Sequence, residues 1–179
     1  MVQKGQEMHP LEIFKFCPKC GGGRFQINSS RSKKCDDCGF EYYKNPIVGV
    51  CVAVFDNMDR MLCIRRDNEP GRGMLGLPGG FTEFDETLEQ TAVREVVEET
   101  GAKIELTELV ANIPNSYVFS GLDVRPLDFY FTARLVDGSH IKPQPGEVSD
   151  ILFIPRDEID IDAFAFPSAR QFLKKLLNK

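Results

Sequence analysis

The chain has 179 residues, six cysteines, no tryptophan and a formal net charge of −5, a length sufficient for one domain with a hydrophobic core plus a small additional module. The acidic balance gives no reason to expect general nucleic-acid binding. Because the sequence shows neither a signal-type apolar stretch nor a run of roughly 20 apolar residues, we expect a cytoplasmic protein with no membrane partner.

Residues 1–46 carry four of the cysteines, in the pairs Cys17–Cys20 and Cys35–Cys38, each of the form C-x2-C and each followed by glycine. Fourteen residues separate the two pairs. This spacing is typical of a zinc ribbon, and a cytoplasmic setting favours Zn²⁺ over a disulfide or redox role. Four thiolates fill a tetrahedral shell, so the pattern predicts a closed, structural zinc site.

The same segment has a weak basic character. It holds eight Lys/Arg and five Asp/Glu, formally +3, and four thiolates around one Zn²⁺ would leave about +1. Its aromatic residues could stack on bases: Phe25, Phe40, Tyr42 and Tyr43. With so little positive charge, we expect a packing role or a homodimer contact for this segment rather than nucleic-acid binding.

Residues 47–179 are expected to form one α/β domain. Residues 47–55 and 61–66 predict a hairpin of buried strands, in which Cys51 and Cys63 are core residues. A Gly/Pro-rich loop over residues 67–80 follows. The remaining expected elements are strands at 103–113, 116–120, 127–136 and 148–155, with helices at about 86–100 and at 167–179.

The helix expected at 86–100 is crowded with acids. Glu95, Glu98 and Glu99 are spaced i, i+3, i+4 and share one face. A valine stripe is expected nearly opposite, in the core, at Val93, Val96 and Val97. Like charges at this spacing cost roughly 0.2–0.5 kcal/mol per pair, and the C-terminal half of a helix disfavours anions. A Mg²⁺ or Mn²⁺ ion would resolve this; a solvated acidic face is the alternative.

The residues around this helix resemble the Nudix box over 23 positions. The pattern consists of Gly80, Glu86, the run Arg94-Glu95-Val96, the pair Glu98-Glu99, and Gly101-Ala102. The resemblance implies an α/β/α sandwich that hydrolyses nucleoside diphosphates linked to another moiety. It also implies that Glu95, Glu98, Glu99 and the Gly80 carbonyl bind the cations, and that Arg94 and Glu86 brace the loop against the helix.

Several residues are candidates for the proton acceptor and for the substrate contacts. Glu98 or Glu99 could take the proton from water, and Glu147, in a later loop, is a further candidate, although it is equally explained as a surface acid. Either Arg65 or Arg66 could pair with substrate phosphate, because alternation along a strand prevents both from facing the site.

A four-Cys ribbon before a Nudix domain is similar to the NADH pyrophosphatase arrangement. The Ser-Gln-Pro-Trp-Pro-Phe-Pro type of signature expected downstream is missing from residues 112–131. The resemblance therefore favours a nucleotide-derived small molecule: NAD(H), ADP-ribose, FAD or a dinucleoside polyphosphate. Tyr117 or Phe119 could stack on its base or could be a core residue. The alternatives are a non-catalytic nucleotide sensor and an RNA-end hydrolase that uses the ribbon as a platform.

Overall fold

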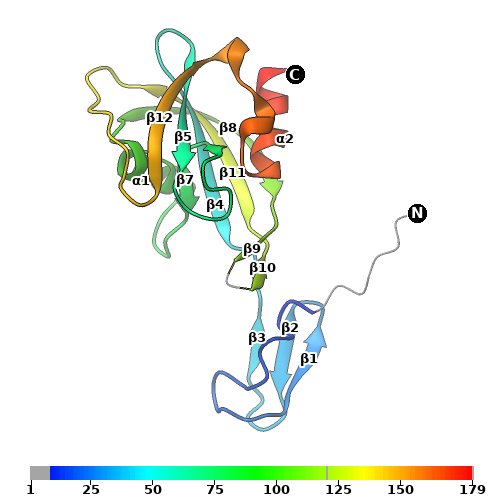
Figure 1. Cartoon of the computed structure of the whole chain (residues 1–179). Coiled ribbons are helices and arrows are strands. Elements are labelled where there is room, and N and C mark those ends of the chain that lie inside the picture. Colours follow the sequence, from blue (N-terminus) through cyan, green and yellow to red (C-terminus); the bar gives the residue numbers. More distant parts are fainter. Residues whose placement is uncertain (1–8, 120, 179) are drawn as a thin grey trace. The chain divides into compact units, whose positions relative to one another are not determined.

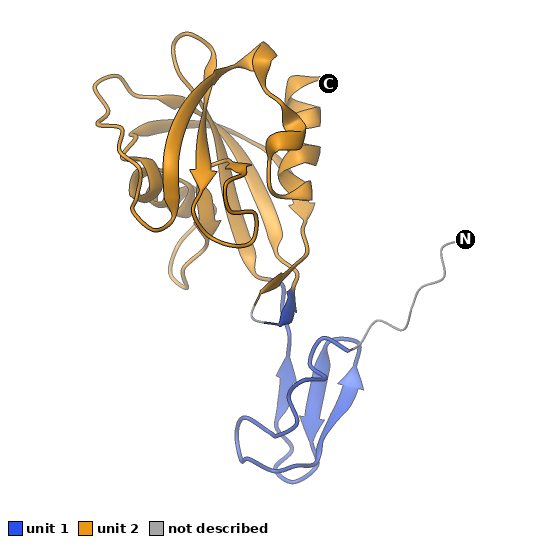
Figure 2. Ribbon diagram, viewed as in Figure 1, with its two compact units in different colours: residues 1–46, 120–123 blue, residues 47–119, 124–179 orange. Residues whose placement is uncertain are grey.

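The computed structural model describes residues 9–119 and 121–178. The chain forms two compact units, which are coloured separately in Figure 2. The smaller unit comprises residues 1–46 and 120–123, and the larger comprises residues 47–119 and 124–179. Each unit has its own sheet and its own hydrophobic core, so each is described by itself.

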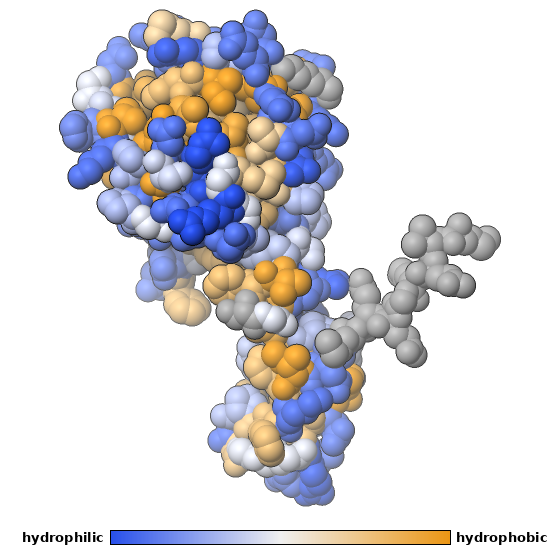
Figure 3. Space-filling model, viewed as in Figure 1, coloured by the Kyte–Doolittle hydropathy of each residue, from blue (hydrophilic) through white to orange (hydrophobic). Residues whose placement is uncertain are grey.

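The smaller unit is an antiparallel sheet of three short strands. These are β1 (Phe25–Ser29), β2 (Ser32–Cys35) and β3 (Glu41–Tyr43), in that spatial order. Its core consists of Cys17, Phe25 and Cys35, with Phe40 packed against them. Apolar side chains remain on its surface (Figure 3), including Phe16, which is 68% exposed. A core this small supplies little stability without a disulfide or a metal ion.

The larger unit is built on a mixed sheet (Figure 1). Its strands are β4 (Val48–Phe55), β5 (Arg60–Arg66), β6 (Leu75–Gly76), β7 (Gly79–Phe81), β8 (Ile104–Pro114), β11 (Leu127–Leu135) and β12 (Val148–Pro155). The main order is β12-β5-β4-β11-β8, with β6 pairing with β5 and β7 with β4. All pairs are antiparallel except β4 with β11. Between β8 and β11 in sequence come β9 (Tyr117–Phe119) and β10 (Leu122–Val124).

Helices cover both faces of this sheet, α1 (Leu88–Thr100) on one and α2 (Pro167–Leu177) on the other (Figure 1). Side chains alternate along β4, as the pleat requires: Val50, Val52 and Val54 pack with α1, whereas Ala53 packs on the side of α2. Two short 3₁₀ helices, η1 (Arg156–Glu158) and η2 (Ile161–Ala163), precede α2. The fold is therefore α/β with three layers, which confirms the fold class predicted from the sequence.

Helix α1 begins two residues later than expected because Thr87 caps it. The Thr87 side chain accepts from the Gln90 N–H while the Gln90 side chain accepts from the Thr87 N–H, which forms a capping box. The helix ends at Gly101, whose φ of 67° provides the left-handed C-cap. Within the described ranges, no helix is long and apolar enough to cross a membrane.

The expected valine stripe of α1 is wrong in two of its three positions. Val96 is fully buried, but Val93 and Val97 are 39% and 44% exposed. The buried side of the helix instead follows Ala92 and Val96 and includes Glu99, which is 6% exposed. The sheet therefore lies closer to the glutamate side of the helix than hydrophobicity indicated, and one acid of the cluster is enclosed.

Candidate active site

The glutamates of α1 lie against the strand β7. The Gly79 N–H donates to Glu99 Oε2 at 2.9 Å. The Glu95 carboxylate lies directly over Gly80, since a Cβ built on that glycine would be 2.3 Å from Glu95 Oε1 and 2.7 Å from Oε2. Glu98 points outward, with its side chain 53% exposed. Two of the three predicted carboxylates are thus held beside the Gly79–Gly80 backbone.

Arg94 connects the acids of this region. Its guanidinium donates to both oxygens of Glu86, at 2.6 and 2.9 Å, and through Nη1 to Glu95 at 2.8 Å and Glu98 at 3.1 Å. It also donates to the Phe81 carbonyl at 3.1 Å. The ion pair between Arg94 and Glu86 that the family resemblance implied is therefore confirmed, and it fixes the loop after β7 against the helix.

The electrostatics of the site reflect burial and mutual repulsion. Burial, together with the nearby carboxylates of Glu95 and Glu147, raises the pKa of Glu99 to about 8, although the Gly79 N–H opposes the shift. Burial also raises the pKa of Glu95, with Arg94 opposing it. In contrast, hydrogen bonds from Arg94 lower the pKa of Glu86 to about 2. The cluster therefore disfavours its own full ionisation, which is the situation that a bound cation relieves.

The donor set fits a hard divalent cation. Carboxylate oxygens and a backbone carbonyl are the ligands that Mg²⁺ and Mn²⁺ prefer. The close approach of Glu95 to Gly80 leaves no room for a Cβ, so a glycine is needed for the carboxylate to lie over this strand. Arg94 donates hydrogen bonds to Glu95 and Glu98. Among the described residues, the carboxylate oxygens of the three glutamates are not close enough together to form a complete metal site. A cation would enter beside them rather than into a preformed shell.

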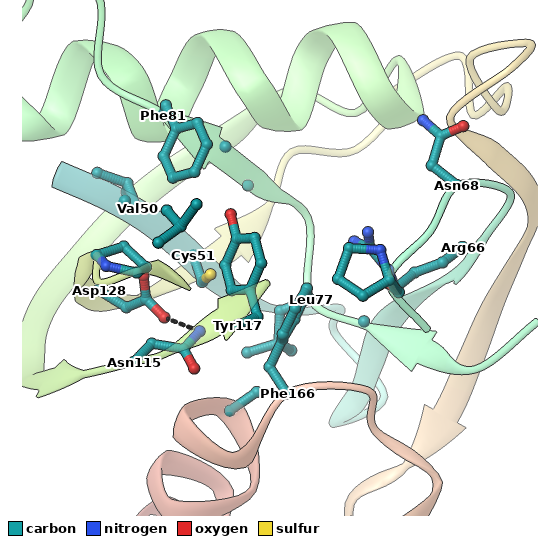
Figure 4. A pocket seen from close by; sticks show the side chains of 18 of the residues that line it. Val50, Cys51, Arg66, Asn68, Leu77, Phe81, Asn115, Tyr117, Asp128 and Phe166 are labelled. Atoms are coloured by element: carbon teal, nitrogen blue, oxygen red, sulfur yellow. Dashed lines mark hydrogen bonds between the residues drawn. The ribbon is translucent and has the colours of Figure 1, made fainter. Parts of the chain in front are cut away.

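A pocket of about 590 Å³ opens beside these glutamates (Figure 4). Of the residues predicted from the sequence, six line it: Gly80, Glu99, Arg66, Tyr117, Phe119 and Glu147. Arg65 does not; its guanidinium donates to the Gly73 carbonyl instead. Strand alternation thus places one of the two arginines in the pocket, as expected. Glu147 is exposed at the pocket wall.

Aromatic side chains form much of the remaining wall. The rings of Tyr117 and Phe166 are 5.5 Å apart and tilted by 43°. The Arg66 guanidinium lies 4.8 Å from the centroid of Phe166. Phe81 and Phe119 also line the pocket. Flat aromatic faces beside a cationic group suit a planar ring and its attached phosphates.

Sequence reasoning missed several polar residues of this pocket. Asn115, Asp128 and Tyr130 line it, and Cys51, expected in the core, lies in its wall instead and is only partly buried. The expectation for Cys63 is confirmed, since it is fully buried. The sequence does contain one indication of these polar residues: Asp128 is an acid within an apolar strand, and a buried carboxylate requires hydrogen-bond partners or a ligand.

In the smaller unit, the four cysteines come together. The Sγ atoms of Cys17, Cys20, Cys35 and Cys38 all lie within 4.8 Å of one another. The Cys17–Cys38 separation is 3.8 Å and the Cys20–Cys35 separation is 3.7 Å. Zinc–sulfur bonds of about 2.3 Å at tetrahedral angles require sulfur–sulfur edges of roughly 3.8 Å. The described cysteines are all free thiols, and their arrangement fits Zn²⁺.

Comparison with known proteins places this arrangement in a family. The NUDIX domain family model matches residues 45–176, which is most of the chain. The chain belongs to the NUDIX domain family. A crystal structure of a NUDIX hydrolase from Nitrosomonas europaea is similar over 92% of this chain and 90% of that protein, with 30% identity and a TM-score of 0.75. Residues 80–102, which resemble the Nudix box, include α1 and the loop before it.

Two further relatives bear on the substrate. A protein of Vibrio cholerae named NAD-capped RNA hydrolase NudC is 28% identical over 142 residues, covering 79% of this chain and 49% of that protein. The chain thus spans about half the length of these curated relatives. The NUDIX domain of Shewanella oneidensis NrtR, solved in complex with ADP ribose, is 25% identical, with a TM-score of 0.58 over 76% of this chain and 89% of that one.

Proposed function

We propose that the chain is a Mg²⁺-dependent pyrophosphohydrolase that cleaves a nucleoside diphosphate linked to a second group. One observation carries this proposal: Glu99 and Gly80 line the same pocket as Tyr117 and Phe166. Glu99, a carboxylate suited to a divalent cation, thus lies at one part of the pocket, and ring-binding surfaces lie at another. A nucleotide with a pyrophosphate linkage has both of the chemical parts that these walls suit.

The cation would be held by Glu95, Glu98, Glu99 and the Gly80 carbonyl. When bound, Mg²⁺ or Mn²⁺ neutralises the anionic pyrophosphate and lowers the pKa of water, so that attack on phosphorus becomes feasible at neutral pH. Arg94 positions Glu95 and Glu98 through its 2.8 and 3.1 Å hydrogen bonds rather than contacting the reacting atoms.

The structure favours Glu147 as the proton acceptor among the three candidates. Glu99 is buried and accepts from Gly79, and Glu98 is paired with Arg94. Glu147 lines the pocket and is exposed, and its side chain forms no hydrogen bond or ion pair with the rest of the described chain. A carboxylate that is accessible and not already paired is better placed to take a proton from water.

For the substrate, the proposal is an adenosine diphosphate linked to another group, hydrolysed to AMP and the second phosphate. The names of two relatives support this choice, since one is an NAD-capped RNA hydrolase and the other binds ADP ribose. Because the first name refers to an RNA end, NAD-capped RNA is the second candidate, and a non-catalytic nucleotide sensor is the third.

We also propose that Cys17, Cys20, Cys35 and Cys38 bind one Zn²⁺ as a structural zinc ribbon. The sulfur separations support tetrahedral thiolate coordination. Four protein ligands leave no open position for a substrate, so this metal would stabilise the smaller unit without taking part in the chemistry.

The activity is tested by incubating the protein and Mg²⁺ with NADH, NAD, ADP-ribose, FAD, diadenosine polyphosphates, NAD-capped RNA and nucleoside triphosphates. Products are identified by chromatography, with a chelator as the control. AMP and a second phosphate from one of the small dinucleotide-type substrates support the proposal. Turnover confined to triphosphates or to capped RNA rules it out, and tight binding without turnover indicates the sensor.

A further inference from the structure

A polar group occupies one part of the pocket, away from the glutamates of α1. Asp128, near the start of β11, is only 7% exposed and lines the pocket together with Asn115. In Figure 4 these two residues lie on one side of Tyr117, and Arg66 and Asn68 lie on the other. Asp128 has no role in the proposed hydrolysis.

The hydrogen bonds to Asp128 all converge on one of its oxygens. Asn115 Nδ2 and Ser168 Oγ each donate to Oδ2 at 2.9 Å. The Tyr130 hydroxyl lies 3.5 Å from the same oxygen and donates at 2.8 Å to Ser168 Oγ. These donors fix the orientation of the carboxylate and fully occupy Oδ2.

The other oxygen, Oδ1, lies over Gly49. A Cβ built on Gly49 would be 2.6 Å from Asp128 Oδ1, and Gly49 itself lines the pocket. Asp128 forms no ion pair with any described residue. Burial raises the pKa of Asp128 although its hydrogen-bond donors oppose the shift. Each printed hydrogen bond to Asp128 goes to Oδ2, so Oδ1 remains an acceptor to which a ligand bearing an N–H group can donate.

The surrounding walls restrict the shape of that ligand. Tyr117 and Phe166 present ring faces, and Val50 and Leu77 add apolar surface in the same pocket (Figure 4). A pocket of about 590 Å³ has the usual size for a nucleotide-like molecule. These walls suit a ligand that is flat, largely apolar, and carries a hydrogen-bond donor at its edge.

We propose that Asp128 Oδ1 accepts a hydrogen bond from the exocyclic amino group of the substrate's nucleobase, and so selects an amino-bearing base over its oxo counterpart. The inference rests on the proposed function, which places the pyrophosphate beside Glu95 and Glu99. It adds that the base lies between Tyr117 and Asp128.

Replacement of Asp128 by asparagine gives a sharp test because the existing donors dictate how the amide must orient. Ser168 and Asn115 donate to the position of Oδ2, so the amide oxygen occupies that position. The amide NH₂ then replaces Oδ1 over Gly49. An acceptor facing the pocket becomes a donor, which suits a 6-oxo purine and leaves a 6-amino purine facing an N–H group.

The experiment measures binding of AMP and IMP by calorimetry to the wild type, to Asp128→Asn and to Asp137→Asn, an exposed control outside the pocket. The wild type and Asp137→Asn should bind AMP at least about tenfold more tightly than IMP, the change expected for one hydrogen bond to a charged group. Asp128→Asn should reverse the preference. An AMP to IMP ratio that is the same in all three proteins overturns the inference.

A second measurement tests the inference even if Asp128→Asn fails to fold. The wild type is titrated with AMP and with purine riboside 5′-monophosphate, which lacks only the amino group; equal affinities overturn the inference. Because both measurements use products, they are independent of turnover. A preference for AMP without hydrolysis of any pyrophosphate would contradict only the proposed function. Hydrolysis without a preference between the bases would contradict only the inference about Asp128.

Discussion

Substitution of Gly80 by alanine should separate catalysis from folding. The backbone at Gly80 does not adopt the left-handed region, so alanine introduces no backbone strain. Its Cβ would, however, lie 2.3 Å from Glu95 Oε1, where ordinary contact begins at 3.4 Å. The Glu95 carboxylate must therefore move by roughly 1 Å, and a displacement of that size at a catalytic group costs about 100-fold in rate, or about 2.7 kcal/mol of transition-state stabilisation.

The stability cost should be much smaller, about 1 kcal/mol or less, because the group that moves is the end of a flexible side chain. Initial rates with ADP-ribose and excess Mg²⁺ give kcat/KM, and urea unfolding of the same preparations gives the free energy of unfolding. Gly23→Ala, at an exposed glycine with open space around it, is the matched control. Wild-type kcat/KM in Gly80→Ala, or a loss of activity that follows a comparable loss of stability, would refute the placement of Glu95 over Gly80 as the functional arrangement.

Three further outcomes are expected. Glu99→Gln should remove most activity at saturating Mg²⁺ while leaving the urea midpoint within the range of Glu89→Gln, an exposed control on the same helix; activity near that of the control would show that the cation site is misplaced. Elemental analysis should find about one zinc per chain, lost in Cys35→Ser and kept in Cys63→Ser, and a wild type without zinc would contradict the ribbon. Burial raises the folded-state pKa of Asp128 above its usual 3.8, so its stabilising contribution is complete below that pH and is lost as the pH rises through the folded value. Asp128→Asn should therefore gain unfolding free energy relative to the wild type as the pH rises above about 4, whereas a pH-independent difference in urea unfolding would oppose this.

The elements of the larger unit could be predicted because their local signals agree with the fold. The run from Val48 to Phe55 alternates between two buried faces, so nearly continuous hydrophobicity correctly indicated a central strand. Gly101 correctly marked the end of α1. Helix α1 starts two residues after the predicted position. Glu86 belongs to the preceding loop, where its carboxylate accepts hydrogen bonds from Arg94, and Thr87 is the N-cap.

The remaining details depend on tertiary packing. The sheet approaches the glutamate side of α1, so Val93 and Val97 are exposed and Glu99 is buried, opposite to their hydrophobicity. The apolar strand around Cys51 predicts a core position for this residue, yet the pocket reaches that strand. The partners of Asp128 come from segments 13 and 40 residues away, and no local pattern indicates which distant side chains will converge.

The position of Arg94 has a consequence for how each unit would respond to a chelator. With its guanidinium among Glu86, Glu95 and Glu98, the acidic face of α1 is already partly compensated, so the larger unit can reach its folded state before it encounters a divalent cation. Among the described residues of the smaller unit there is no such substitute, since two of the three side chains in its buried hydrophobic cluster are themselves cysteines of the quartet. Loss of Mg²⁺ would thus be a reversible event that leaves the architecture intact, whereas loss of Zn²⁺ would be an unfolding event. A single chain would then carry one exchangeable metal ion that controls turnover and one permanently bound metal ion that keeps the smaller unit folded.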